Sequence, residues 1–281
     1  MQPATWRLVL SPPLSGALNM AVDEAVLESV GQGLSLPTLR LYAWDPPCLS
    51  LGYAQPGSDL DLPALQQRGW QFVRRPTGGR AILHTDELTY AVIAPPNEPR
   101  VSGSVLESYQ RLSLALLRAL QLLGAQPHAE EKSPAPNPSG PGPVCFEAPS
   151  NFEITVEGKK LVGSAQARRK EGVLQHGSLP LVGDLTRITQ GLAFPDQAAR
   201  TRAAERLLQR ATTLEAVLHR RVSWDEAAQA FQEAFSQILG LSFQPEALSP
   251  QEWARAQALA AEKYSDPTWL LRPLAAPTPN P

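Results

Sequence analysis

The stretch from Phe72 to Val92 constrains the fold more than any other part of the chain. An apolar segment that ends at Val73 predicts a strand, a Pro-Thr-Gly-Gly turn follows it, and a second strand is predicted from Leu88 to Val92. The adjacent glycines Gly78 and Gly79 permit positive φ angles and let a ligand approach the main chain without meeting a Cβ. Backbone amides of such a loop can receive carbonyl or phosphate oxygens. The segment therefore predicts either a ligand-binding loop between two strands or an ordinary hairpin turn with flanking charges.

Length and charge limit the classes of protein to which the chain can belong. Its 281 residues, 43% of them hydrophobic, suffice for one large globular domain with an appendage or for two small domains. The net charge of −2 gives no electrostatic reason to expect a nucleic acid or an anionic membrane as a partner. We find no signal peptide and no apolar run approaching the ~20 residues that span a bilayer, so we expect a soluble cytoplasmic protein.

The chain has two cysteines, and a reducing cytoplasm argues against a disulfide between them. Cys48 lies in a Pro-Pro-Cys-Leu-Ser-Leu-Gly segment that predicts a buried strand, so we expect it to pack in the core. Cys145 is either an ordinary thiol or a nucleophile, because a thiol becomes reactive where a neighbouring cation stabilises its thiolate. With two cysteines and no histidine cluster, we expect no metal site.

Apolar periodicity predicts further strands and helices around the central stretch. The strands are Thr5 to Leu10, Leu39 to Trp44 and Leu49 to Tyr53, and the helices are Leu18 to Val30, Leu62 to Arg68 and Val105 to Leu123. Asn19 to Glu24, in the first of these helices, are interpreted as scaffold with polar caps. The last helix carries an apolar stripe that should face the core, namely Leu106, Tyr109, Leu112, Leu116 and Leu120.

The segment from Gln126 to Pro143 is dense in proline, glycine, serine and asparagine. Such a composition buries too little apolar surface to offset the entropy cost of ordering, so we expect a mobile loop. Long loops inside compact domains are often lids or binding loops, and this one leads directly to Cys145.

A β-hairpin is predicted after this loop, from Phe152 to Gly163. Glu157 and Gly158 form its turn, and Lys160 begins the returning strand, with Lys159 as a solvated neighbour. The residues from Gln175 to Leu179 predict another strand of the same sheet.

The remainder of the chain has a helical pattern. Three residue pairs match the capping box that opens helices: Thr212 with Glu215, Ser223 with Glu226, and Ser249 with Glu252. We therefore divide the chain into residues 1–189, which form the main part of the domain, a helical C-terminal region at 190–274 and a disordered tail at 275–281. The C-terminal region is interpreted as a small helical subdomain or appendage.

The string Arg-Arg-Pro-Thr-Gly-Gly-Arg-Ala, with His84 and the Glu-Leu-Thr-Tyr at 87–90, resembles one family closely. It is similar to the signature of the lipoate-protein ligase and octanoyltransferase superfamily, which is related to the biotin protein ligases. The resemblance implies an α+β fold of the class II synthetase-like kind, with a mixed central β-sheet flanked by helices and a family domain at about residues 34–243. It also implies that the loop lines an acyl pocket, which gives substrate-binding roles to Arg75, Thr77, Gly78, Gly79 and His84.

Three further motifs resemble the branch of this superfamily that contains cysteine-dependent octanoyltransferases. They begin at Cys145, Lys160 and Gln175. The resemblance implies that Cys145 forms an acyl thioester and that Lys160 lowers the pKa of Cys145 and orients the acyl carbonyl. It assigns substrate binding to Gly163, Ser164, Ala165, His176 and Gly177. The ATP-using lipoate ligases share the glycine loop and the lysine but lack the cysteine.

The reaction that this resemblance implies is ping-pong transfer of octanoate from acyl carrier protein to a lysine of a lipoyl domain. The glycine cleavage H protein and the 2-oxoacid dehydrogenase E2 subunit are such acceptors. Exchange between thioesters is roughly isoenergetic and amide formation is downhill, so we expect no ATP, metal or organic cofactor. Separately, we expect a monomer. Alternatives are an ATP-dependent lipoate-protein ligase, an amidotransferase between lipoyl proteins, and a non-catalytic acyl-binding module.

Several side chains near the motifs have two interpretations. His84 and His176 are either hydrogen-bonded structural histidines or catalytic ones, and His84 is a candidate acceptor for the proton of the incoming lysine. Arg74 and Arg75 either form salt bridges within the sheet or meet an acidic carrier protein. The amides of residues 78–79 or 164–165 are candidate hydrogen-bond donors to the oxyanion. Phe72, Leu83 and Val162 are candidate walls of an apolar tunnel for the eight-carbon chain.

Overall fold

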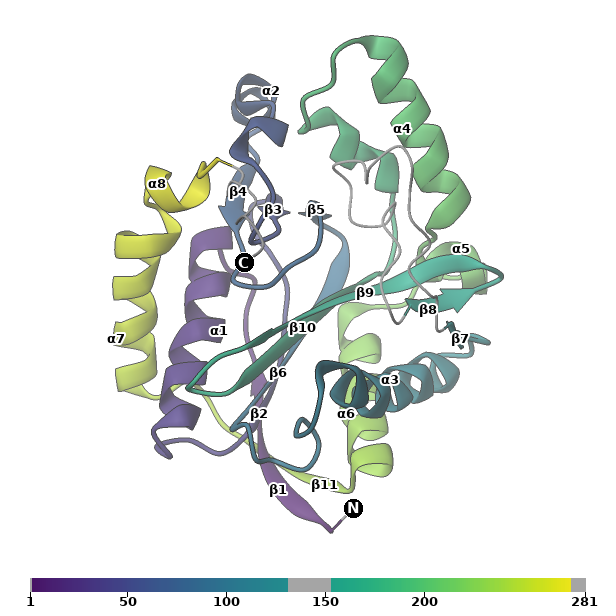
Figure 1. Ribbon diagram of the computed structural model, residues 1–281. Coiled ribbons are helices and arrows are strands. Elements are labelled where there is room, and N and C mark those ends of the chain that lie inside the picture. Colours follow the sequence, from purple (N-terminus) through teal and green to yellow (C-terminus); the bar gives the residue numbers. More distant parts are fainter. Residues whose placement is uncertain (1, 131–152, 274–281) are drawn as a thin grey trace, which may run out of the picture.

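The computed structural model describes residues 2–130 and 153–273 of the chain (Figure 1). Cys145, most of the predicted loop at 126–143 and the predicted tail at 275–281 lie outside the described residues. At the centre is a mixed sheet of eight strands, in the order β11-β1-β2-β6-β10-β9-β8-β7. Its strands are β1 (Ala4–Leu10), β2 (Thr38–Tyr42), β6 (Glu87–Ala94), β7 (His128–Glu130), β8 (Glu153–Val156), β9 (Lys159–Arg168), β10 (Val173–Pro180) and β11 (Leu241–Pro245).

A second, three-stranded sheet carries the glycine loop. Its strands are β3 (Cys48–Leu51), β4 (Gln71–Arg74) and β5 (Ile82–His84). Both β4 and β5 pair with β3 and not with each other, so the residues between them cross over the end of β3. The interpretation of this stretch as a hairpin turn is therefore wrong. Gly52, directly after β3, allows this crossing, because a Cβ there would lie 2.0 Å from the carbonyl oxygen of Gly79.

Helices cover both faces of the large sheet, as Figure 1 shows. On one side lie α1 (Gly16–Gly31), α7 (Pro250–Leu259) and the π-helical turn η4 (Ala260–Tyr264), and on the other lie α3 (Val105–Leu122) and α6 (Trp224–Leu239). The remaining helical elements are η1 (Gly57–Asp59), α2 (Leu62–Gln67), η3 (Leu185–Gln190), α4 (Gln197–Arg210), α5 (Leu214–Leu218) and α8 (Pro267–Leu270). The strand β6 is buried on both faces: Tyr90 belongs to the core under α3 and α6, and Ala91 to the core under α1. The expected mixed sheet flanked by helices is confirmed.

The details differ from the sequence predictions in three places. The helix α3 forms as predicted, but Leu106 is 40% exposed, and the buried face runs through Leu112, Leu116 and Leu120. β7 lies within the segment predicted to be a mobile loop, since His128 to Glu130 pair with β8. Thr213, and not Thr212, caps α5 by accepting a hydrogen bond from the amide of Ala216.

The region after residue 190 is part of the main body. The helix α6 lies in the region predicted as a helical subdomain or appendage, and it packs on the sheet with Phe231 and Phe235 at 5.9 and 6.2 Å from the ring centroid of Tyr90. β11 extends the sheet by pairing in parallel with β1. A buried ion pair joins α7 to β1, with Arg7 Nη2 2.7 Å from Glu252 Oε1.

This ion pair gives a stability prediction. Burial by itself raises the pKa of Glu252, but Arg7, Ser249 and Ser35 outweigh it and lower that pKa from 4.5 to about 2. A carboxyl whose pKa is depressed by folding stabilises the protein above its unfolded pKa and loses that contribution as the pH falls toward its folded pKa. Replacing Glu252 by glutamine should lower the free energy of unfolding by about 3 kcal/mol at pH 7 and by about half as much at pH 3.

Urea denaturation of both proteins at the two pH values measures this difference. Glu262→Gln, at an exposed position on the turn after α7, is the matched control and should change the free energy of unfolding by less than about 0.5 kcal/mol. A loss for Glu252→Gln that is equal at both pH values contradicts the assignment.

Candidate active site

A pocket opens where the glycine loop meets β9, β10 and α1. It encloses about 420 Å³, its open mouth included. The residues that line it are Met20, Tyr42, Trp44, Ser50, Arg75, Gly79, Ile82, His84, Thr89, Gly163, Ser164, Ala165, His176, Gly177 and Ser178. Arg75, Gly79, His84 and all five predicted residues of β9 and β10 are therefore brought together. Three predictions are wrong, because Phe72, Leu83 and Val162 do not line this pocket.

The strands β9 and β10 form one wall through small residues. They run antiparallel, with Ala165 opposite His176 and Ser164 opposite Gly177. A Cβ at Gly177 would lie 2.4 Å from the carbonyl oxygen of Gly163 and 2.7 Å from the ring of Tyr90, so only glycine fits there. The absence of a side chain at Gly177 lets the two backbones and the ring of Tyr90 pack closely together.

The two arginines before the glycine loop bind backbone carbonyls, and those of the loop itself are bound by Arg75. Arg74 is 0% exposed and donates to the backbone carbonyls of Gly52 and Gln55, among others. Arg75 is 3% exposed and donates to the carbonyls of Gly78 and Arg80 and to the hydroxyl of Ser50. Their proposed contact with an acidic carrier is wrong, since neither guanidinium reaches the surface.

A chain of hydrogen bonds runs from the glycine loop into the core through His176. Thr77 Oγ1 lies 2.6 Å from His176 Nε2, and His176 Nδ1 lies 3.2 Å from Asp23 Oδ2. Arg40 Nη1 donates to the other carboxylate oxygen of Asp23, Oδ1, at 2.7 Å, and the Tyr42 hydroxyl donates to Oδ2 at 2.9 Å. Thr77 thus braces the loop and does not itself line the pocket.

Burial sets the charges of this chain. It lowers the pKa of His176, against the opposing effect of Asp23, so the imidazole is neutral at neutral pH. Burial alone would raise the pKa of Asp23, but Arg40 and His176 outweigh it and hold that pKa below its ordinary value of 3.8. The arrangement stabilises a fixed geometry in which the Asp23 carboxylate is balanced by the Arg40 guanidinium.

Sequence reasoning missed Asp23, which it treated as part of a polar cap. Asp23 lies on the buried face of α1 between Met20 and Val26, all of them under the sheet. A carboxylate inside an otherwise apolar helix stripe is a signal that could have identified it, because a buried charge needs a partner.

A second chain runs along the opposite wall through His84. Ser50 Oγ lies 2.8 Å from His84 Nε2, and His84 Nδ1 lies 2.5 Å from Glu87 Oε1. The hydroxyl of Thr89 also donates to Glu87 Oε1, at 2.6 Å. The indole of Trp44 stacks on the imidazole with 3.9 Å between ring centroids, and its N–H donates to Thr89. Ser50 was not among the residues selected from the sequence.

Lys160 lies in the β8–β9 hairpin, which forms as predicted with Glu157 and Gly158 at positive φ in its turn. Its ammonium nitrogen lies 3.2 Å from Glu153 Oε1, and the side chain is 4% exposed. Lys159 is exposed, as predicted. Cys145, its predicted partner, lies outside the described residues.

The hydroxyl of Ser178 faces the pocket. It is 1% exposed and has no hydrogen-bond partner among residues 2–130 and 153–273. A buried hydroxyl of this kind is available to a bound ligand. Within the same residues there is no group of three or more His, Cys, Asp or Glu side chains that could hold a metal ion. No helix in this part of the chain is long and apolar enough to cross a membrane.

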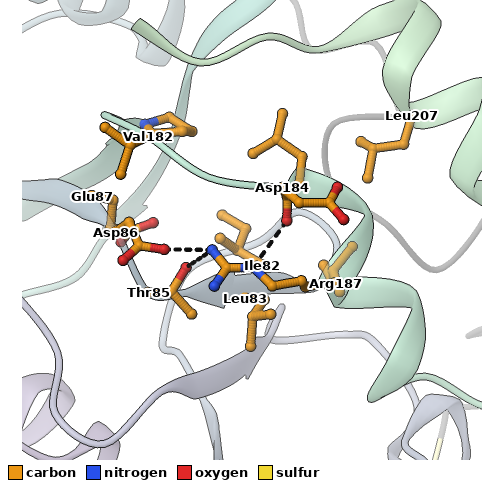
Figure 2. A pocket seen from close by; sticks show the side chains of 12 residues that line it. Ile82, Leu83, Thr85, Asp86, Glu87, Val182, Asp184, Arg187 and Leu207 are labelled. Atoms are coloured by element: carbon orange, nitrogen blue, oxygen red, sulfur yellow. Dashed lines mark hydrogen bonds and ion pairs between the residues drawn. The ribbon is translucent and has the colours of Figure 1, made fainter. Parts of the chain in front are cut away.

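A second hollow lies on the other side of β5, and Figure 2 shows it from close by. Leu83 points into this hollow, which explains its absence from the first pocket. The side chain of Arg187 crosses this hollow, and its Nη2 donates to Asp86 at 2.5 Å and to Thr85 at 3.0 Å. The carboxylate of Glu87 forms part of its lining, so the chain Ser50–His84–Glu87 connects the two hollows.

Comparison with known proteins gives a consistent result. The family model described as "Lipoyl protein ligase A/B catalytic domain" matches residues 15–236. A protein of Kyrpidia tusciae named "Octanoyltransferase LipM" is 43% identical over 268 residues, which cover 93% of this chain and 97% of that protein. One of the same name from Brevibacillus brevis is 40% identical over 276 residues, covering 95% and 99%.

Solved structures agree with the fold. The lipoate protein ligase of an archaeal lipoylation system from Thermoplasma acidophilum, described as bi-partite and studied with its E2 lipoyl domain, superposes with a TM-score of 0.79 at 25% identity, covering 98% of this chain and 99% of that one. A lipoate-protein ligase A bound with ATP superposes with a TM-score of 0.76 at 25% identity, covering 95% and 98%.

Proposed function

The chain belongs to the lipoyl protein ligase A/B catalytic domain family and is an octanoyltransferase, and we propose that it transfers an octanoyl group to a lipoyl domain through a thioester on Cys145. The donor is octanoyl-acyl carrier protein, and the acceptor is the lysine of a lipoyl domain of the kind named with the Thermoplasma ligase. The product is an octanoyl amide, which starts protein lipoylation.

The observation that carries this proposal is the shape and lining of the pocket. Its lining combines buried apolar side chains, among them Met20, Trp44 and Ile82, with hydroxyls, imidazoles and a glycine of the loop. Ligand pockets typically combine apolar walls with a few polar groups. A medium-length acyl chain with a reactive carbonyl at one end has this distribution of polarity.

The first half-reaction loads the enzyme. The thiolate of Cys145 attacks the carbonyl carbon of the octanoyl thioester on the carrier, a new C–S bond forms, and the carrier's thiolate leaves with the electron pair of the broken C–S bond. The buried ammonium of Lys160 supplies the positive charge that favours the Cys145 thiolate. Hydrogen-bond donors for the oxyanion are the amides of the glycine loop and of β9 and the unpartnered hydroxyl of Ser178.

The second half-reaction transfers the acyl group to nitrogen. The neutral amine of the acceptor lysine attacks the carbonyl carbon of the enzyme thioester, and the C–N bond forms. The nitrogen then gives up one proton to become the amide, the C–S bond breaks, and its electron pair leaves on the sulfur of Cys145 as a thiolate, ready for the next cycle. Because amide formation from a thioester is downhill, the proposed route needs no ATP, metal or organic cofactor.

The direct test mixes the enzyme with octanoyl-acyl carrier protein and a lipoyl domain in the absence of ATP, and records the intact mass of the lipoyl domain. We expect the lipoyl domain to gain one octanoyl group on its lysine. Transfer that occurs only from free octanoate or lipoate with ATP would identify a ligase instead, and transfer that requires an octanoyl-lipoyl protein as donor would identify an amidotransferase. Binding of octanoate without any transfer would leave an acyl-binding module.

A further inference from the structure

Two chains of the same composition reach the pocket through His84 and His176, and each has a hydroxyl, an imidazole and a carboxylate. In Thr77–His176–Asp23 and in Ser50–His84–Glu87, the hydroxyl faces Nε2 of the imidazole and the carboxylate accepts from Nδ1. This is the arrangement in which a carboxylate orients a histidine so that its Nε2 can take a proton from a hydroxyl. The two chains differ in the electrostatic environment of their carboxylates.

The charge of Asp23 is already balanced. The Arg40 guanidinium lies 2.7 Å from it, and neither side chain is exposed. A proton added to His176 would therefore find a neighbouring carboxylate that is neutralised by Arg40, in a buried setting that disfavours the imidazolium. The His176 chain is suited to holding the glycine loop in position.

The charge of Glu87 is not balanced in this way. Among residues 2–130 and 153–273, its ion-pair partner is His84 alone, at 2.5 Å, and its other hydrogen-bond donor is the neutral hydroxyl of Thr89. An imidazolium at His84 would thus be stabilised by an adjacent carboxylate that no lysine or arginine in this part of the chain neutralises. The face of the ring is covered by Trp44, which fixes its orientation and adds a favourable contact for a cation.

The hydroxyl of Ser50 has room for one more partner. A hydroxyl has one proton to donate and two lone pairs. The proton is directed to His84 Nε2, because Nδ1 carries the hydrogen donated to Glu87, and one lone pair accepts from Arg75 Nη1 at 3.1 Å. Ser50 lines the pocket although it is 0% exposed, and its second lone pair is the acceptor left for an N–H group.

We propose that Ser50, His84 and Glu87 form the proton-accepting chain of the second half-reaction, in which the acceptor lysine loses its proton. The attacking nitrogen gives its proton to Ser50 Oγ while the Ser50 proton passes to His84 Nε2. The lysine ammonium thereby becomes an amine, whose electron pair forms the C–N bond to the thioester carbonyl. As the C–S bond breaks, its electron pair leaves on sulfur, and the nitrogen releases its second proton to solvent to become the amide. The imidazolium of His84 then returns its proton to solvent.

This inference rests on the proposed function, and it names a base other than Lys160. An ammonium paired with the carboxylate of Glu153 has no lone pair with which to accept a proton. Other ionisable groups near the chain are Arg75, which donates to Ser50, His176, which also lines the pocket, Cys48, which pairs with His84 across the β3–β5 ladder, and Tyr42, whose pKa is raised chiefly by burial and in part by Glu87.

Single-turnover kinetics separate the two half-reactions. Wild type, Ser50→Ala, Glu87→Gln and Ser113→Ala are each loaded with octanoyl-acyl carrier protein, freed of excess donor and mixed with a lipoyl domain. Ser113 is a buried serine on α3 outside the pocket, so Ser113→Ala is the matched control and should behave as wild type. Loading, read by intact mass, reports on folding and on the proposed function in every variant.

We expect Ser50→Ala and Glu87→Gln to load normally but to transfer about 100-fold more slowly than wild type near pH 7, which is the size of a general-base contribution. Without the base only the free amine reacts, so this ratio should shrink as the pH rises toward the ordinary lysine pKa of about 10.4. A purely structural role would reduce the rate by the same factor at every pH.

Three results overturn the inference. Transfer by Ser50→Ala within about threefold of wild type at all pH values shows that no proton passes through Ser50. An octanoyl ester on Ser50, stable to neutral hydroxylamine, makes Ser50 a nucleophile and not a relay. Wild-type enzyme that fails to load overturns the thioester route itself, and the relay with it. Normal loading by every protein, with variant transfer rates equal to that of wild type, overturns the relay alone.

Discussion

Replacing Cys145 by alanine is expected to reduce octanoyl transfer from acyl carrier protein by about 10⁴-fold or more, since removal of a covalent nucleophile has effects of this size in other enzymes. The reason is that the proposed route has no acyl intermediate without the sulfur of Cys145. The initial rate of octanoyl-lipoyl domain formation, with saturating donor and no ATP, measures the loss.

The second cysteine provides the matched control. Cys48 is fully buried on β3, and burial together with the nearby charge of Glu87 raises the pKa of its thiol, so it is an inert core residue, as predicted. Cys48→Ala should retain the rate to within about threefold and lose only modest stability. A Cys145→Ala enzyme that still transfers at a comparable rate would remove Cys145 from the mechanism. A folded Cys48→Ala enzyme that does not transfer would contradict the inert role of Cys48.

The second large effect is expected at Lys160. Exchanging it for glutamine should slow the loading step by about 1,000-fold at pH 7, because the charge that favours the thiolate and the developing oxyanion is lost. The loading rate of the variant should recover as the pH passes the ordinary thiol pKa of about 8.5, where the thiolate forms without assistance. Stopped-flow or quenched mass measurements of loading between about pH 6 and pH 10 test this.

The adjacent lysine makes this test specific. Lys159 is exposed while Lys160 is buried beside Glu153, so Lys159→Gln removes the same charge from the same turn of the hairpin. It should load at the wild-type rate at every pH. Equal losses in both variants would indicate a general electrostatic effect of the hairpin on the acidic carrier and would contradict a specific role for Lys160.

The fold could be predicted where local pattern and tertiary packing agree. The alternation around Tyr90, the apolar helix at Val105–Leu122 and the Glu157-Gly158 turn each have a strong local signal, and each forms where expected. The strand β11 was missed because it has five residues, ends in proline and follows a helix within a helical region. Only its pairing with β1 makes it a strand, and that partner lies more than 200 residues away in the sequence.

The path of the glycine loop could not be read from the sequence for a related reason. Two strands joined by a short turn usually pair with each other. Here β3, which is earlier in the chain, lies between β4 and β5, and it is the close packing of Gly52 against Gly79 that permits the crossing. The order of strands in a sheet depends on long-range pairing, and the sequence of a turn does not determine it.

The candidate site was found mainly through its motifs. They identified the loop, β9 and β10, which supply most of the lining, but they did not identify the polar side chains behind it. Asp23, Arg40 and Ser50 come from separate elements, and their roles depend on tertiary contacts. The fold places Asp23, with Arg40 bound to it, beside His176, and it places Ser50 beside His84. The acyl carrier donor, the monomeric state and the cytoplasmic location stay predictions.

The central claim is that an octanoyl thioester forms on Cys145, and one measurement tests it most directly. Wild type and Cys145→Ala are each mixed with octanoyl-acyl carrier protein, without ATP and without a lipoyl domain, and their intact masses are recorded. The account predicts that wild type gains one octanoyl group, that neutral hydroxylamine removes it, and that Cys145→Ala gains none. A wild-type enzyme without an adduct, or an adduct that also forms on Cys145→Ala, would contradict it.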